Sequence, residues 1–150
     1  MAQSLSNILV HLIFSTKDRW PWIRPEVEGK LYAYLAAVCR SCGCPSVLIG
    51  GTQDHVHILS ALSRTATVAE LLEQIKKSSS KWIKTKGPEY RPFAWQGGYA
   101  AFSIGQSNVE AVKQYIARQR EHHRAVSFQE ELLRFLTKYR VAYDERYLWD

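Results

Sequence analysis

Short apolar segments, the first of them rich in β-branched and aromatic residues, predict four β-strands in this chain. Successive side chains on a strand point to opposite faces, so apolar residues at every second position are typical of a strand with one buried face. In the first such segment, Ile8, Val10, Leu12 and Phe14 share one face and His11 lies on the other. A glycine pair between the second and third segments predicts a hairpin. The four segments are residues 7–14, 46–50, 54–62 and 98–104.

Apolar residues at helical spacing predict four helices between and after these strands. The first begins at Pro25, whose fixed φ suits the first helical position, and ends before Gly43 and Pro45. The other three open with a capping box, in which a Ser or Thr and a Glu three residues later satisfy free backbone groups. We expect the third helix to run to about His123. The boxes are Thr67 with Glu70, Ser107 with Glu110, and Ser127 with Glu130.

The order of these elements predicts an α+β fold. Strand, helix, two strands, helix, strand and helix, followed by one extra helix, match the ferredoxin-like (split βαβ) arrangement. That arrangement has an antiparallel sheet with helices packed on one face, here with a C-terminal helix added. The chain has no internal repeat and no linker, so we expect residues 1–150 to form a single domain. The second face of the sheet would be open for function.

The charge balance favours a partner that carries phosphate groups. Twenty Lys and Arg against fourteen Asp and Glu give a formal net charge of +6. Basic side chains neutralise phosphates and release counterions, although a basic helix face is equally explained by simple solvation. The candidate DNA contacts lie at the end of the first strand and on the outward face of the second helix. They are Lys17, Arg19, Lys76, Lys77, Lys81 and Lys84.

The cysteines and the N-terminus indicate a cytoplasmic protein. Three cysteines (Cys39, Cys42 and Cys44) cannot form a disulfide framework, and reduced thiols near a helix end explain them better than a zinc site. The apolar run near the N-terminus has no basic residues before it and is too short to span a membrane. We therefore expect no membrane association.

A histidine pair lies on the third predicted strand. His55 and His57 are two residues apart, so they project from the same face while Val56 and Ile58 point into the core. Two imidazoles on a rigid strand are good ligands for a divalent ion. Taken alone, the pair is also explained by two partly exposed histidines on a solvated sheet face.

A tyrosine and a glutamine share one face of the third predicted helix. Tyr115 and Gln119 are four residues apart, and the same face continues to His122 and His123. A tyrosine beside an apolar stripe usually has a packing role. However, its phenol oxygen can also attack the phosphorus of DNA, and a metal ion helps because phenol, with a pKa of about 10, is a poor nucleophile near neutral pH. The carbonyl oxygen of Gln119 could serve as a third protein ligand.

The combination of these motifs resembles a known family. HVH on a strand followed by a helix with YxxxQ is similar to the HUH single-tyrosine transposases of the smallest bacterial insertion sequences, the IS200-like transposases. Their relatives, the REP-associated tyrosine transposases, share these motifs. The resemblance extends over nearly the whole chain, through the segments HLIFSTKDR, DHVHIL, WQGGYAAFSI and YIARQREHHR.

The resemblance implies a complete reaction. His55, His57 and Gln119 would bind Mg²⁺ or Mn²⁺, and Tyr115 would form the covalent link to DNA. The substrate would be single-stranded DNA whose hairpins mark the ends of an element. No nucleotide cofactor would be needed, because the phosphotyrosine bond stores the energy for rejoining. Many members are homodimers that complete each other's sites, and some REP-associated members are monomers.

Three further residues could support the metal site. By alternation, His11 faces the same side as the histidine pair. Asp54 could orient a histidine ligand or simply end the hairpin, and His122 could approach a phosphate or the ligands of the metal, or lie at an exposed helix end.

Other functions remain open from the sequence. A domesticated relative that processes repetitive hairpins would need the same active site. A ferredoxin-like module that only binds nucleic acid would explain the basic helix and leave both motifs as coincidences. A phosphodiesterase that uses water would retain turnover after Tyr115→Phe.

Overall fold

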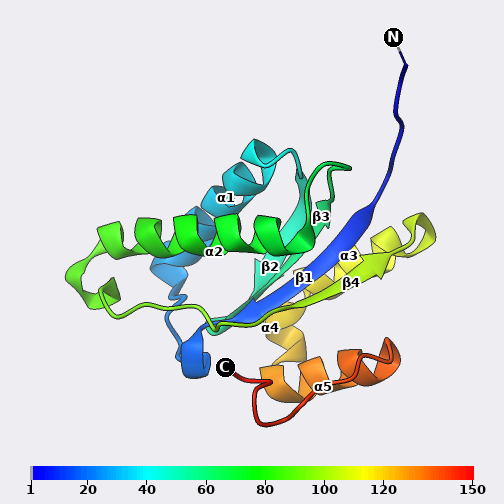
Figure 1. Cartoon of the computed structure of the whole chain (residues 1–150). Helices are drawn as coiled ribbons and strands as arrows, with labels where there is room; N and C mark the ends of the chain where they lie inside the picture. The colour runs from blue at the N-terminus through cyan, green and yellow to red at the C-terminus, as the bar shows by residue number, and fades with distance from the viewer. Residues whose placement is uncertain (1) are drawn as a thin grey trace.

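The computed structural model describes residues 2–150, which form a four-stranded antiparallel sheet with helices on both faces (Figure 1). The sheet order is β2-β3-β1-β4, the order of the ferredoxin-like fold that the sequence predicted. Every strand end lies within two residues of its predicted position. The strands are β1 (Leu9–Ser15), β2 (Ser46–Gly51), β3 (His55–Ala61) and β4 (Ala100–Ile104).

Helices α1 (Pro25–Ser41) and α2 (Val68–Ile83) cover one face of the sheet. The alternation in the sequence correctly assigns the side chains on this face. Leu12 and Phe14 of β1 and Val56 and Ile58 of β3 are all 0% exposed and belong to the main apolar core. Burial of such side chains stabilises the fold by about 1.5–3 kcal/mol each.

The opposite face, which we expected to be open, is partly covered by three helices: α3 (Val109–Ala117), α4 (Gln119–His122) and α5 (Phe128–Lys138). Figure 1 shows α5 on the side of the sheet away from α1 and α2. Phe128, Leu132 and Leu136 of α5 pack with Ile13 of β1 and Phe102 of β4. This second face therefore has its own core, separate from the first.

Two of the three predicted capping boxes have the expected N-cap bond. The Thr67 and Ser127 side chains each accept a hydrogen bond from the backbone N–H three residues later, at 3.1 Å. The box at Ser107 was wrong, since α3 begins at Val109 with Asn108 as N-cap and no capping side chain.

The prediction of one helix to His123 was also wrong. The backbone leaves helical geometry at Arg118 (φ −102°, ψ 20°), which divides the segment into α3 and α4. This break turns Gln119 toward the sheet, where it is 1% exposed. Tyr115 and Gln119 therefore reach the same site from two different helices.

The helix that carries Tyr115 lies unusually close to β2. A Cβ at Gly50 would lie 2.6 Å from the backbone oxygen of Ile116, a distance that real Cβ atoms essentially never show. Glycine is needed here because a side chain would push α3 off the sheet.

Among the described residues, no helix is both long and apolar enough to cross a membrane.

Candidate metal and nucleophile site

His55 and His57 are fully buried on the face of β3 that α3, α4 and α5 cover. Both are 0% exposed, and their ring centroids are 5.2 Å apart. Their burial excludes the alternative of two histidines on a solvated sheet face. A buried polar side chain destabilises the fold unless it has partners, so the hydrogen bonds of these rings define the site.

The Nδ1 atom of each histidine has a partner on the sheet side. His55 Nδ1 lies 2.8 Å from Asp54 Oδ1, and His57 Nδ1 lies 2.8 Å from His11 Nε2. Thr52 in turn donates a hydrogen bond to Asp54 at 2.9 Å. Burial lowers the pKa of His57 to about 4 and that of His11 to about 3, which keeps both rings neutral. The Nε2 atoms of His55 and His57 are left facing the helices.

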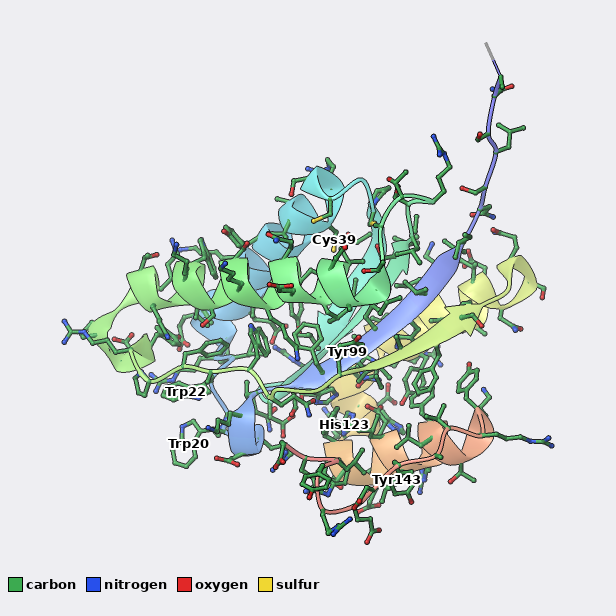
Figure 2. All side chains as sticks on the ribbon, viewed as in Figure 1. Trp20, Trp22, Cys39, Tyr99, His123 and Tyr143 are labelled. Carbon is green, nitrogen blue, oxygen red and sulfur yellow. The ribbon has the colours of Figure 1, made fainter. Side chains whose placement is uncertain are left out.

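Two side chains from the helical layer contact these Nε2 atoms, and His123 lies beside them. Gln119 Oε1 lies 2.9 Å from His55 Nε2, and Glu131 Oε1 lies 2.9 Å from His57 Nε2. His123 Nε2 lies 3.0 Å from Gln119 Oε1, and Figure 2 shows His123 between the sheet and α5. Ligand atoms of His55, His57, His123 and Glu131 all fall within 4.8 Å of one another, so this group could hold a metal ion.

The Tyr115 hydroxyl borders this cluster. It donates a hydrogen bond to Glu131 Oε2 and lies 3.4 Å from His122 Nε2. Burial and the Glu131 carboxylate both raise the pKa of Tyr115, so the phenol is protonated. The side chain is half-buried and also borders a cavity of about 470 Å³ between α3 and α5. A polymer chain could therefore approach the hydroxyl from this cavity.

Residues 4–119 of this chain match the model of the family described as "Transposase IS200 like". This chain belongs to the IS200-like transposase family. It is therefore a transposase, an enzyme that processes DNA. No curated protein matched the chain.

Two solved structures resemble this IS200-like transposase in fold. One is a candidate transposase from Deinococcus radiodurans R1, with 21% identity and a TM-score of 0.62 over 79% of this chain and 98% of that chain. The other is a REP-associated tyrosine transposase bound to a REP hairpin, with 13% identity and a TM-score of 0.61. That comparison covers 82% of this chain and 74% of that chain. At these identities the likeness shows the shared fold.

Sequence reasoning missed Glu131, and it treated His123 only as a residue that could approach a phosphate or the ligands of the metal, or lie at an exposed helix end. Both lie beyond the segment of this transposase that matches the family, which ends at Gln119. Glu131 falls in the first turn of α5, where an acidic residue is expected to face solvent and favour the helix dipole. The sequence feature that could have revealed Glu131 is its spacing from the apolar residues of the same helix. It follows Phe128 by three residues and precedes Phe135 by four, so it lies on the apolar stripe of the helix.

The basic residues that we predicted to contact DNA divide into two groups. Lys17, Lys77, Lys81 and Lys84 are exposed. Lys76 is not on the outward face as we expected, because its Nζ donates to the carbonyl oxygens of Gln96, at 2.9 Å, and Gly98. Burial lowers the pKa of Lys76 to about 8.

Arg19 is also engaged within the chain. It donates a hydrogen bond to Trp149 O at 3.0 Å, with its guanidinium 5.8 Å from the centre of that ring. The C-terminal segment is thereby held against the end of β1.

The cysteines lie far from this region. Cys39 is in α1 on the other side of the sheet (Figure 2), and all three thiols are free.

Proposed function

We propose that this transposase cleaves and rejoins single-stranded DNA through Tyr115, assisted by a divalent ion held by His55, His57 and Gln119. The observation that carries the proposal is the position of the Tyr115 hydroxyl, which shares a hydrogen-bond network with the buried histidine pair. A packing tyrosine would not need this position. Family membership and the fold support the transposase activity, and the geometry of the site supports the proposed chemistry.

The donor atoms fit a divalent ion. The Asp54 carboxylate only accepts hydrogen bonds, so the His55 tautomer that it favours carries its proton on Nδ1 and leaves Nε2 free to bind an ion. Gln119 Nε2 donates to Glu131 at 3.2 Å, which turns Gln119 Oε1 toward His55 Nε2. Two acceptor atoms then face each other at 2.9 Å. A cation between them would satisfy both lone pairs, and nitrogen and oxygen donors suit Mg²⁺ or Mn²⁺.

In the proposed reaction, the Tyr115 oxygen attacks the phosphorus of a DNA phosphodiester. The bond from phosphorus to Tyr115 forms, and the bond to the 3′ oxygen breaks. The phenol loses one proton and the departing 3′ oxygen gains one, giving a 5′-phosphotyrosine and a free 3′-hydroxyl. A bound ion would polarise the phosphate and orient it for in-line attack. Attack of a 3′-hydroxyl on the phosphotyrosine reverses these steps, so rejoining needs no nucleotide cofactor.

Single-stranded DNA with hairpins is the proposed substrate. The related transposase of similar fold was solved with a REP hairpin bound, which supports this class of ligand. The cavity beside Tyr115 is lined by Arg134 and Lys138, which could contact phosphates, and by Phe135 and Tyr139, against which a base could stack. The exposed lysines of α2 would add phosphate contacts on the other side of the sheet.

We further propose that residues 1–150 act as one domain in which Tyr115 serves the metal site of its own subunit. Tyr115 and both histidines meet within one chain, which supports this arrangement. The homodimer that the resemblance implies would then pair two complete sites.

A strand-cleavage assay tests the proposal. Labelled single-stranded DNA from the flanks of the gene is incubated with the protein and Mg²⁺ or Mn²⁺, and the products are separated on a denaturing gel. We expect a shifted covalent band that is absent with chelator and with Tyr115→Phe. Hairpin binding without a covalent band under either ion would favour a module that only binds DNA. Cleavage retained by Tyr115→Phe would favour a hydrolase that uses water.

A further inference from the structure

We propose that Glu131 completes the metal site, with one carboxylate oxygen as a ligand of the ion and the other holding the Tyr115 hydroxyl. The inference rests on the proposed function, because it adds a residue to the same site. Glu131 lies outside the family-matched segment, in the helix that follows it. It would make α5 a part of the active site.

The burial of Glu131 is the first argument. The residue is 1% exposed on the apolar stripe that packs α5 against the sheet. Moving a carboxylate out of water costs several kcal/mol, and an apolar residue would fill the same space without that penalty. A buried anion in this position needs a positive partner.

The position of Oε1 is the second argument. Glu131 Oε1 lies 2.9 Å from His57 Nε2 and 3.5 Å from His55 Nε2, the two atoms proposed to bind the ion. Two neutral imidazoles and an amide bring no charge to a divalent ion. Mg²⁺ and Mn²⁺ prefer carboxylate oxygens, and Glu131 is the only acidic member of the cluster of possible ligands among the described residues.

The position of Oε2 is the third argument. This oxygen accepts hydrogen bonds from the Tyr115 hydroxyl and from Gln119 Nε2, and it lies 3.1 Å from His123 Nε2. One carboxylate therefore contacts both the proposed ligands and the proposed nucleophile. Such a bridge would fix the phenol oxygen relative to the ion before DNA arrives, which reduces the reorganisation needed for attack.

The backbone of α5 holds Glu131 in place. Ser127 caps the helix, and Phe128 and Leu132 anchor it on either side of Glu131 with 3% and 4% exposure. A ligand on a rigid, packed helix is placed more precisely than one on a loop. Glu130, the neighbouring residue, is exposed and offers a matched control on the same helix.

The test is a Mn²⁺ titration of the whole protein without DNA, followed by calorimetry and by Mn²⁺ electron paramagnetic resonance. We expect Glu131→Gln to weaken Mn²⁺ binding by at least about tenfold, since loss of even an indirect partner of a metal site costs about 10–100-fold. Glu130→Gln should remain within about twofold of the unaltered protein. The amide keeps the shape of the carboxylate, and a thermal melt in chelator checks the fold of each variant.

Equal or tighter Mn²⁺ binding by Glu131→Gln would overturn the inference, because it would mean that the carboxylate only fills the site. If Glu131→Gln does not fold, Glu131→Asp takes its place. Its shorter arm should also weaken binding, and equal or tighter binding would be the same contradiction. His57→Ala separates this inference from the proposed function. If His57→Ala loses Mn²⁺ binding while Glu131→Gln keeps it, Glu131 is rejected as a ligand. If the unaltered protein does not bind Mn²⁺, the proposed metal site itself is rejected.

Discussion

The two faces of the sheet are built from the same strands but hold interiors of different kinds. Toward α1 and α2, the central strands present Leu12, Phe14, Val56 and Ile58, all 0% exposed and apolar. Toward α3, α4 and α5, the alternate positions of the same strands present His11, His55 and His57, which are equally buried. Burial alone therefore does not distinguish residues that stabilise the fold from residues of the candidate site in this protein.

The difference lies in what fixes each side chain. An apolar interior is held by shape and volume, so a residue of similar size can replace another at modest cost. The polar interior is held by hydrogen bonds that join His55 to Asp54, Gln119 to Glu131, and His11 through His57 to Glu131. We expect substitutions on the first face to change stability and those on the second to change metal binding and cleavage.

The largest effect should come from His57→Ala. Loss of a proposed metal ligand should reduce cleavage by at least about a thousandfold, because the ion polarises the phosphate. Hairpin affinity should stay nearly unchanged, since phosphate contacts to basic side chains supply most of it. A gel-based cleavage assay and a binding titration on the same preparation measure both. Normal cleavage by this variant would remove the metal assignment.

Ile58, which follows His57 in sequence and points to the other face, should affect stability and leave metal binding unchanged. Ile58→Ala should lower the free energy of unfolding by about 2–5 kcal/mol, because it leaves a cavity in the apolar core. Urea denaturation measures the change. At a temperature where the variant is folded, its Mn²⁺ affinity should match that of the unaltered protein. A large loss of Mn²⁺ affinity in the folded variant would contradict the separation of the two faces.

Asp54→Asn should have a smaller effect on the polar face. The carboxylate accepts the hydrogen bond from His55 Nδ1, and an amide can present either a donor or an acceptor there. We expect Mn²⁺ affinity to fall by about 10–100-fold, the usual result of losing a partner that orients a histidine ligand. The same calorimetric titration measures it. Unchanged affinity would mean that Asp54 only ends the hairpin.

The smallest effect should come from the exposed lysines of α2. Reversal of Lys77 and Lys81 to Glu should weaken DNA binding and flatten its dependence on salt, with about 0.7 lost from the slope for each phosphate contact. Reversal of Lys30 and Arg40, which are exposed on α1, changes the net charge equally and is the control. An unchanged salt slope would show that DNA does not contact α2.

The strands and the histidine pair were predictable because their patterns are local. Alternation determines which side chains share a face, so the amino-acid sequence alone is enough to place His11, His55 and His57 together. The order of strands and helices was likewise enough to predict the ferredoxin-like sheet. These features depend on neighbours in sequence, which one chain displays directly.

The remaining features depend on contacts between distant segments. Residues 115–123 contain no proline or glycine, so nothing local predicts the break at Arg118 that turns Gln119 inward. Glu131 looked like an ordinary acidic residue in the first turn of a capped helix. Lys76 looked solvated because the carbonyl groups that bind it come from residues 96 and 98. Each of these positions is set by tertiary structure.

The central claim is that Tyr115 forms the covalent bond to DNA, and mapping of the attachment site tests it most directly. The covalent product is trapped with Mn²⁺, digested with nuclease and trypsin, and analysed by mass spectrometry. Trypsin should release residues 114–118, in which Tyr115 is the only tyrosine. We predict a nucleotide-bearing form of this peptide that requires the ion. A nucleotide on any other peptide, or none on this one when cleavage has occurred, would contradict the claim.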